Sequence, residues 1–324
     1  MSEIIILNEK DNVGIAKRTL KIEEEGAIAV IPKGHKIAIK EITKGQPVIK
    51  YAQTIGYASE NIAKGSHVHI ENLEFRNVVK DYEFGSNKVK LDPPTEMSSF
   101  WGYRRKDGRV GTRNTIAIIT SVNCSATAAR LIAEHFNSGL LEKFKNVDGV
   151  TAYVHGTGCG MADSGEGFEA LQRVMWGYAK NPNVAGVLMV GLGCEMNQIE
   201  WLVEAYGFST GSLFQTMNIQ DLAGLRKTVE YGIEKVSHML PIVDKFSRVK
   251  CPASDLTVAL QCGGSDAWSG VTANPALGYA CDLLVACGGT GVLAETPEIY
   301  GAEHLLTIRA SSPQVGKKLI KTIN

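Results

Sequence analysis

The stretch TIAIITSVNC, residues 115–124, is a run of apolar, mostly β-branched side chains that ends at a cysteine. Four further runs of this design follow along the chain, at residues 150–159, 184–194, 257–262 and 283–287. The first three cysteines, Cys124, Cys159 and Cys194, are evenly spaced, with a helix-like stretch between neighbours. Strand, crossover helix and strand in this rhythm predict a parallel sheet. The cysteines would then line its carboxyl edge, where open α/β sheets bind ligands.

The composition is that of a soluble globular protein, with 324 residues of which 44% are hydrophobic and 21% charged. The 34 basic and 34 acidic residues balance, which argues against a nucleic-acid or membrane partner. The longest apolar run, residues 184–192, is too short to cross a bilayer. The N-terminal MSEIIILNEK has no basic segment, so we expect a cytoplasmic protein. In that compartment the seven cysteines are expected to be thiols or metal ligands rather than disulfides.

Residues 1–75 predict a small all-β domain. A motif recurs three times, as IPKGH, ITKGQ and IAKGS, and puts Gly34, Gly45 and Gly65 where a tight turn needs a positive φ. The predicted strands are residues 4–7, 27–31, 36–39, 47–51 and 67–70.

The polar residues 76–99 predict a linker. In residues 100–324 strands and helices alternate, which predicts a Rossmann-like, doubly wound parallel sheet with helices on both faces. The predicted helices are residues 125–136, with Ser125 as N-cap, 167–180 and 221–240.

The stretch FWGYRRKDGRVGTRN, residues 100–114, places four arginines beside three glycines before the first predicted strand. The planar fork of arginine suits a bidentate grip on carboxylate or phosphate. Arg104, Arg109 and Arg113 are therefore candidate anion ligands. The alternative is a solvated basic loop.

Glycine-rich loops follow the predicted strands, at residues 155–161, 191–195, 261–266 and 287–291. Their backbone N–H groups can bind an anion. Met161 stands where a dinucleotide fingerprint needs its third glycine, so binding of an NAD-type cofactor is not favoured.

The seven cysteines fall into two groups. A free cysteine is often a small buried hydrophobe, and we assign that role to Cys251, Cys281 and Cys287. The others end predicted strands, and three roles stay open for them: ligation of iron, lining of a pocket, and thiol acid/base chemistry. This second group consists of Cys124, Cys159, Cys194 and Cys262.

Histidines and carboxylates also gather locally. His67, His69 and Glu71 alternate along a predicted strand and so share one face, like a non-haem iron or zinc set. An exposed polar strand face is the alternative. His35 follows a turn glycine and is a further candidate ligand. The stretch ETPEIYGAEH, residues 295–304, adds three carboxylates and a histidine that are candidate acids, bases or metal ligands, or the polar face of a helix.

Taken together, these motifs resemble the galactarate/altronate dehydratase family. Residues 1–75 resemble the SAF (β-clip) domain that begins altronate dehydratases, through residues 11–13, 34–36 and 48–51. The remaining matching stretches are residues 102–103, 107–114, 121–127, 158–161, 191–195, 261–266, 272–275 and 295–301.

The resemblance implies dehydration of a sugar acid, of the D-altronate or galactarate type, to a 2-keto-3-deoxy acid with Fe²⁺ or Mn²⁺. The candidate catalytic residues are His155, Cys159, Glu195 and Asp266. The candidate substrate-binding residues are Arg104, Arg109, Arg113, Asn123, Gly263, Gly264 and Ser265. The candidate metal ligands form two alternative sets, either His35, His69 and Glu71 of the β domain or cysteines at the sheet edge, Cys124 and Cys194. An iron–sulfur cluster on the strand-end cysteines is a less favoured reading.

The sequence departs from the family pattern in two ways. Glu71 stands where the altronate-type domain usually has a second histidine, and the chain is expected to lack the family's C-terminal domain. A sulfolactate-type sulfo-lyase and a non-catalytic sugar-acid-binding or subunit-partner fragment are the alternatives. For partners we expect a small-molecule sugar acid, and either further copies of the chain or a second subunit or domain that completes the site.

Overall fold

The structure is a computed structural model that describes residues 2–76, 80–137 and 139–323. The chain divides into two compact units. One unit comprises residues Met1–Thr95 and Thr257–Asn324, and the other comprises Glu96–Leu256. No helix of the described residues is long and apolar enough to span a membrane.

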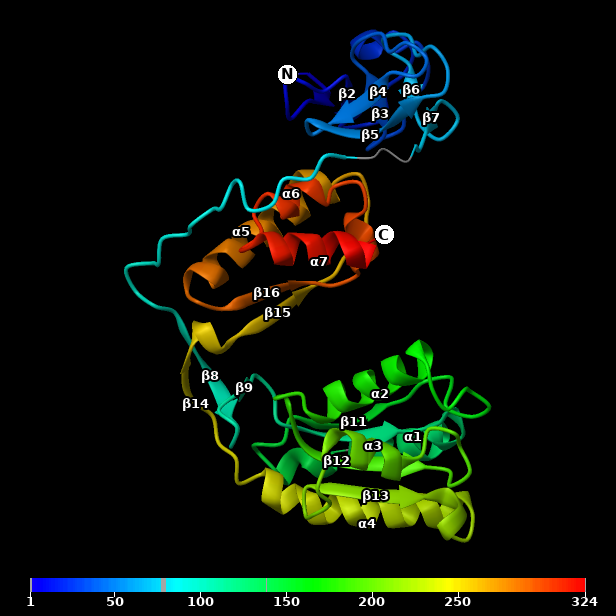
Figure 1. Cartoon of the computed structure of the whole chain (residues 1–324), viewed down its shortest axis with the longest axis vertical. Coiled ribbons are helices and arrows are strands. Elements are labelled where there is room, and N and C mark those ends of the chain that lie inside the picture. Colours follow the sequence, from blue (N-terminus) through cyan, green and yellow to red (C-terminus); the bar gives the residue numbers. More distant parts are fainter. Residues whose placement is uncertain (1, 77–79, 138, 324) are drawn as a thin grey trace. The chain divides into compact units, whose positions relative to one another are not determined.

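The central sheet of the second unit has four parallel strands (Figure 1). They are β10 (Thr115–Thr120), β11 (Gly149–Tyr153), β12 (Val184–Gly191) and β13 (Phe214–Asn218), in the order β11-β10-β12-β13. The first three are the strands predicted from the cysteine-terminated runs. β10 and β12 are almost entirely buried, as expected for strands covered on both faces.

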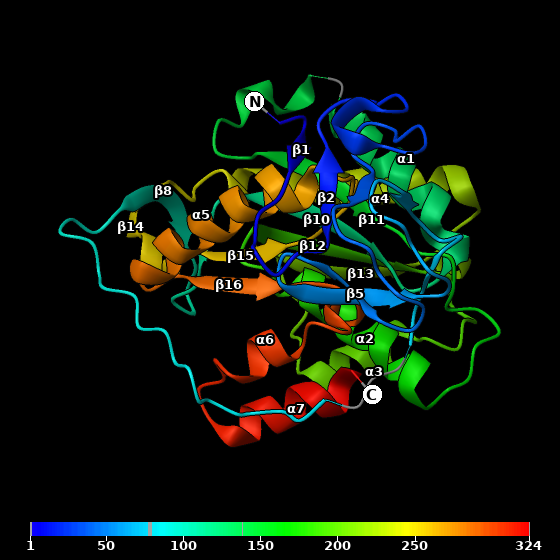
Figure 2. The same cartoon turned by 90° about the horizontal axis from the view of Figure 1, so that it is seen from above.

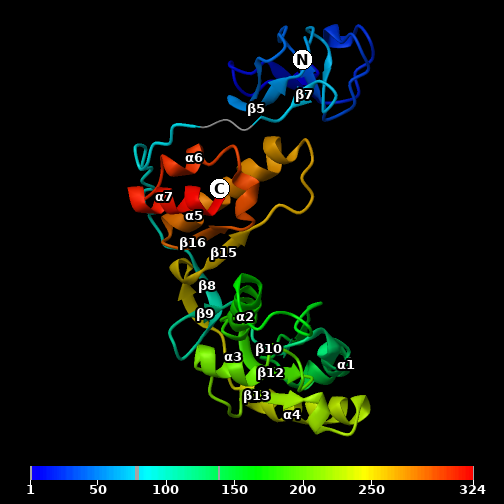
Figure 3. The same ribbon diagram turned by 45° about the vertical axis from the view of Figure 1, so that its right-hand side comes forward.

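Helices cover both faces of this sheet (Figure 3). Alternate side chains of a strand point to opposite faces. Ile116 and Ile118 therefore pack with α1 (Ala126–Asn137) and α4 (Leu225–Val243). Ala117 and Ile119 pack with α2 (Glu166–Ala179) and α3 (Ile199–Tyr206) on the other face.

The α/β class is confirmed, and the sheet order sets where a ligand site is expected. Numbered in chain order, the strands run 2-1-3-4, which is the order of a flavodoxin-type sheet rather than the 3-2-1 order of the Rossmann fold. The order reverses between β10 and β12. The loops after these two strands therefore flank the crevice in which doubly wound sheets bind ligands.

A small antiparallel sheet combines strands from before and after the main sheet in the chain. Its strands are β8 (Ser99–Arg104), β9 (Val110–Gly111) and β14 (Val249–Pro252). The arginine-rich stretch is thus a hairpin, and Cys251 is buried against it, as predicted for a packing cysteine.

The N-terminal β domain contains two antiparallel sheets. One consists of β1 (Ile4–Ile5), β2 (Val13–Ala16), β3 (Lys36–Ala38) and β6 (His67–Val68). The other consists of β4 (Pro47–Lys50), β5 (Gln53–Ala58) and β7 (Leu73–Glu74). Sequence reasoning missed β2, β5 and β7, and predicted a strand at residues 27–31 where only an isolated bridge from Ile31 to Leu20 forms.

The three repeated turns of this domain have the predicted conformation. Gly34, Gly45 and Gly65 have φ of +83°, +83° and +87°. The isoleucine that opens each motif is fully buried, because it anchors the turn in the core of the domain; these residues are Ile31, Ile42 and Ile62.

The C-terminal part of the first unit has its own pair of parallel strands, β15 (Thr257–Leu260) and β16 (Thr290–Leu293). Figure 2 shows α5 (Asn274–Ala286) on one side of this pair, and α6 (His304–Thr307) and α7 (Pro313–Ile323) on the other. Residues 100–324 therefore do not form the single sheet domain that was predicted. The run 283–287 is the end of α5, because a short apolar run fits a helix as well as a strand.

Candidate functional site

The loops after β10 and β12 are joined by a buried hydrogen bond. The hydroxyl of Ser121 donates to Oε1 of Glu195 over 2.5 Å, and the N–H groups of Leu192 and Gly193 donate to the same carboxylate at 3.1 and 2.6 Å. Burial raises the pKa of Glu195, but these hydrogen bonds outweigh it and hold the pKa below its ordinary value. Glu195 is thus an ionised carboxylate that fixes the shape of the loops after β10 and β12.

The loop after β11 packs directly on the loop after β10. The N–H of Asn123 donates to the carbonyl of Thr157 over 2.8 Å. Gly158, at φ +100°, lies so close to the backbone of Ser121 and Val122 that a Cβ there would be 2.8 Å from the Cα of Val122. Three strand-end loops are therefore held together at the carboxyl edge.

His155 is built into this edge through both ring nitrogens. Nε2 lies 3.0 Å from the carbonyl oxygen of Thr120, and Nδ1 accepts from the N–H of Thr157 over 3.3 Å. Burial lowers the pKa of His155, so the ring is neutral near pH 7. His155 and Glu195, both predicted as catalytic, therefore make hydrogen bonds that hold the strand-end loops together.

The cysteines at the edge are the accessible groups. Cys124, Cys159 and Cys194 are exposed, and Cys194 Sγ accepts a hydrogen bond from Gln220 over 3.1 Å. Asn123 is exposed beside them. In the part of the chain that the structure describes, no three His, Cys, Asp or Glu side chains are grouped so as to hold a metal ion. The row of sulfurs exists, but its members are not arranged as a cluster site.

The arginine-rich hairpin lies at the opposite edge of the sheet. The N–H groups of Thr112 and Arg113 donate to Oδ1 of Asn183, which precedes β12, and β10 begins directly after the hairpin. Amino ends of parallel strands share one edge, so the hairpin cannot reach a ligand at the carboxyl edge. The sequence analysis predicted that the arginines and the strand-end loops bind one ligand together. In the structure they lie at opposite edges of the sheet.

Each of the predicted arginine ligands already has an acidic partner. Arg104 pairs with Asp255 at 2.8 Å, Arg109 with Asp107 at 2.7 Å, and Arg113 with Asp148 at 3.6 Å. These exposed pairs are individually weak. The hairpin is better described as a solvated charged surface, which was the alternative reading of the sequence.

In the first unit, three histidine rings of the β domain come together. Nδ1 of His35 lies 2.9 Å from Nε2 of His67, and the ring centroids of His35, His67 and His69 are 5.0 to 5.4 Å apart. Burial, then the nearby His35 and His69, lowers the pKa of His67. Glu71 is exposed, with Oε2 3.4 Å from His69 Nδ1. Sequence reasoning placed His67 on this face but left it out of the ligand set.

Asp266 lies in the first unit, whereas the other predicted catalytic residues lie in the second; these are His155, Cys159 and Glu195. Its Oδ1 accepts from the N–H groups of Trp268 and Ser269 at 2.8 and 3.0 Å, which caps the turn that leads into α5. The preceding residues Gly263, Gly264 and Ser265 form a loop in which Ser265 Oγ contacts Cys262 Sγ.

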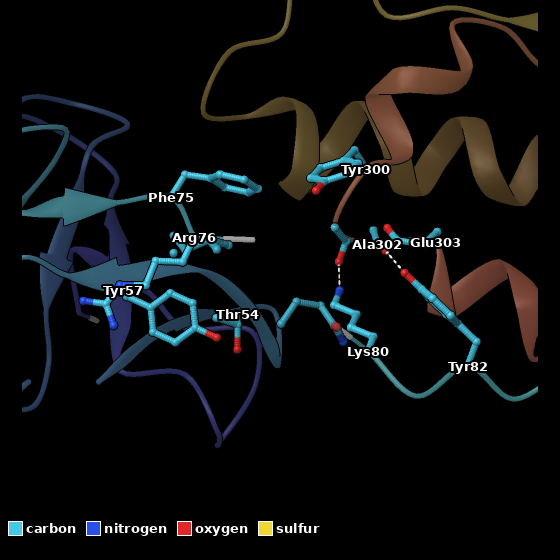
Figure 4. Close-up of a pocket in the computed structure, with 13 residues that line it drawn as sticks. Thr54, Tyr57, Phe75, Arg76, Lys80, Tyr82, Tyr300, Ala302 and Glu303 are labelled. Atoms are coloured by element: carbon cyan, nitrogen blue, oxygen red, sulfur yellow. Dashed lines mark hydrogen bonds between the residues drawn. The ribbon is translucent and has the colours of Figure 1, made fainter. Parts of the chain in front are cut away.

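A cavity of about 580 Å³ in the first unit contains a buried carboxylate (Figure 4). Glu303 is 4% exposed, and its Oε1 accepts a hydrogen bond from the hydroxyl of Tyr82 over 2.6 Å. The ammonium of Lys80 contacts the carbonyl of Gly301 and lies 3.2 Å from His304 Nδ1. Sequence reasoning noted the 295–304 stretch but missed Lys80 and Tyr82, because nothing in the sequence ties the polar linker to that stretch.

Three family models match the chain in succession. They are the SAF domain of altronate/galactarate dehydratases at residues 2–76, the second domain of D-galactarate dehydratase/altronate hydrolase at 102–244, and the D-galactarate/altronate dehydratase C-terminal domain at 253–324. The chain belongs to the galactarate/altronate dehydratase family. The match at 253–324 also corrects the expectation that the family's C-terminal domain is absent from the chain.

Two relatives within this family align with most of the chain. An altronate dehydratase of Bacillus subtilis is 32% identical over 100% of the chain and 66% of its own length. An L-threo-forming galactarate dehydratase of Escherichia coli is 38% identical over 90% of the chain and 57% of its own length. The chain thus spans about six-tenths of the length of these dehydratases.

A more distant relative is divided into two subunits. The (2R)-sulfolactate sulfo-lyase beta subunit of Chromohalobacter salexigens is 31% identical over 68% of the chain and 52% of its own length. The alpha subunit of the same organism is 42% identical over 18% of the chain and 57% of its own length. Members of this wider group therefore occur both as one chain and as two.

Proposed function

We propose that the chain acts in the dehydration of a sugar acid of the D-altronate or galactarate class to a 2-keto-3-deoxy acid, as a hydro-lyase. The observation that carries this proposal is the alignment of 90 to 100% of the chain with an altronate and a galactarate dehydratase. The ordered succession of three matching family domains supports it.

The reaction breaks the C2–H and C3–O bonds and forms water. A base takes the C2 proton, the electron pair forms the C2–C3 double bond, and the C3 hydroxyl leaves with a proton from an acid. The enol product then becomes the ketone. Charge that develops on the carboxylate must be stabilised. At the carboxyl edge of the sheet, Glu195 and His155 hold the strand-end loops, and Cys159 and Asn123 are among the exposed groups there.

We further propose that His35, His67 and His69 contribute ligands to the Fe²⁺ or Mn²⁺ that the family resemblance implies, although the three side chains are not grouped as a complete metal site among the described residues. Imidazole nitrogen suits iron, and the lowered pKa of His67 keeps it in the neutral form that binds metal. The three rings gather on one face, with two ring nitrogens 2.9 Å apart. A bound divalent ion would supply Lewis-acid stabilisation of negative charge on oxygen.

The activity is tested on the purified chain with Fe²⁺ or Mn²⁺ under anaerobic conditions. D-altronate and galactarate are supplied separately, and the keto acid is measured as its semicarbazone. We expect keto acid from one of the two substrates. If neither metal supports product from either substrate, the chain alone does not carry the activity. Product that forms only when a second polypeptide is added would support a two-chain enzyme instead.

The sulfo-lyase relatives favour one second candidate, release of sulfite from a sulfolactate. Sulfite and keto acid are distinguished in the same assay. Sulfite release from (2R)-sulfolactate, without dehydration of either sugar acid, would replace the dehydratase assignment.

The metal proposal is tested by His67→Ala. We expect the variant to bind much less Mn²⁺ than the wild-type chain in equilibrium dialysis. The substitution removes one of the three imidazoles, the one whose ring lies beside those of both His35 and His69. His238→Ala, on the exposed face of α4, is the matched control and should bind Mn²⁺ as the wild type does. Equal Mn²⁺ binding by His67→Ala would place the ion elsewhere.

A further inference from the structure

Glu303 is a buried carboxylate with one oxygen unsatisfied. Its Oε1 accepts from Tyr82, whereas Oε2 is buried and has no hydrogen-bond partner among the described residues. Burial raises the pKa of Glu303, but the hydrogen bond from Tyr82, backbone N–H groups and the charge of Lys80 outweigh it, so the pKa lies below its ordinary value. An ionised oxygen without a donor is costly, so a donor from outside the chain is expected at Oε2.

The polar neighbours of Glu303 have other partners in the structure, and none of them donates to Oε2. The ammonium of Lys80 is directed to Gly301 and His304, and Nε2 of His304 lies 3.0 Å from Oε1 of Gln53. The hydrogen bond to Glu303 raises the pKa of Tyr82 to about 12, so its hydroxyl remains a donor to Oε1 across the physiological range.

The facing wall of the cavity carries a cation and aromatic rings (Figure 4). The guanidinium of Arg76 lies 5.2 Å from the ring centroid of Tyr57, and its hydrogen bonds to Glu74 use Nε and Nη2. The rings of Phe75 and Tyr300 lie 5.8 Å apart. Aromatic faces can cover the C–H face of a sugar, and a guanidinium binds carboxylates.

We propose that this cavity binds a polyhydroxylated carboxylate, with a ligand hydroxyl donating to Oε2 of Glu303 and the ligand carboxylate against Arg76. The volume of about 580 Å³ is that of a small-molecule site and accommodates a six-carbon chain. The class of ligand rests on the proposed function. All of the cavity residues belong to the first unit; they come from β5, residues 75–76, Lys80, Tyr82 and the 300–303 segment.

Binding is measured by calorimetry on the full chain, with EDTA present to prevent metal-dependent turnover. The probes are galactarate, D-altronate and the uncharged polyol galactitol. Wild type should bind both acids more tightly than galactitol. Glu303→Gln should weaken binding of all three by about tenfold or more, because a charged acceptor is lost. Arg76→Gln, on a half-exposed side chain, should weaken only the two acids.

The matched control is Glu83→Gln, an exposed glutamate beside Tyr82 that does not line the cavity. It should bind like wild type. The proposal is overturned if wild type binds none of the probes at millimolar concentration, or if Glu303→Gln and Arg76→Gln, with unchanged thermal midpoints, both bind like wild type. Binding without keto-acid formation in the activity assay would contradict only the proposed function, and keto acid without these mutational effects would contradict only this site.

Discussion

Gly158 is the single residue that most tightly constrains the carboxyl edge. It combines a φ of +100° with direct contact to the backbone of the loop after β10. Gly158→Ala should therefore destabilise the protein by roughly 3 kcal/mol or more, since both the backbone conformation and the packing oppose a side chain. Urea denaturation followed by circular dichroism measures the change.

Gly160→Ala is the matched control in the same loop. Gly160 also has a positive φ, +61°, but no atom lies within 4 Å of the position that a Cβ would take. We expect this variant to lose only about 1 kcal/mol, the conformational part alone. Equal losses for the two variants would mean that contact with Ser121 and Val122 does not hold the loops together.

The lowered pKa of His155 makes the stability of the folded protein depend on pH. Burial lowers its pKa below the ordinary value of 6.5, so below pH 6.5 the unfolded chain takes up a proton that the folded chain does not. This stabilising contribution is complete above pH 6.5 and is lost as the pH falls through the folded pKa. The thermal midpoint should therefore decrease when the pH is lowered from 7.5 to 5.5.

His155→Gln should flatten this dependence, whereas His238→Gln, which is exposed, should leave it unchanged. The flattening is partial, because the pKa values of His67 and His304 are also lowered by burial. A steeper dependence in His155→Gln would contradict a neutral, buried ring.

At the scale of elements, sequence reasoning succeeded where one physical signal determines the structure. The runs ending at Cys124, Cys159 and Cys194 are strands because continuous β-branched burial between helices suits a covered parallel sheet. Sequence reasoning failed at residues 283–287, because a short apolar run is expected in a buried helix as well as in a buried strand. Ser125 was predicted to cap α1, but its hydroxyl instead lies 2.7 Å from the carbonyl oxygen of Val190 and 2.9 Å from that of Val122 and is directed to these acceptors.

The candidate site was foreseen in part for the same reason. The position of Glu195 and His155 at one edge was predictable because they follow strands whose ends share that edge. The separation of the arginine hairpin was not foreseen, although the direction of β10 implies it, since a residue before a strand lies at the amino edge. The pairing of Tyr82 with Glu303 joins residues 221 positions apart and leaves no local pattern in the sequence.

At the scale of the whole molecule, the second unit is one continuous segment with its own core. β14 pairs with β8 in antiparallel register, so that Cys251 lies opposite Phe100 and the two ends of the segment are tied together. Residues 96–256 expressed alone should therefore fold and unfold cooperatively, as a single domain of this size normally does. Thermal and urea denaturation followed by circular dichroism test this.

A shorter segment, residues 115–244, is the control, because it retains β10 to β13 and the four helices but lacks β8, β9 and β14. It loses the buried Cys251 and the hydrogen bonds that Nδ2 of Asn114 donates to the carbonyls of Asn146 and Val243. We expect it to unfold at a lower urea concentration than residues 96–256. If the two segments are equally stable, the small antiparallel sheet contributes nothing to the fold of this unit. If residues 96–256 do not fold at all, the second unit depends on the rest of the chain for its stability.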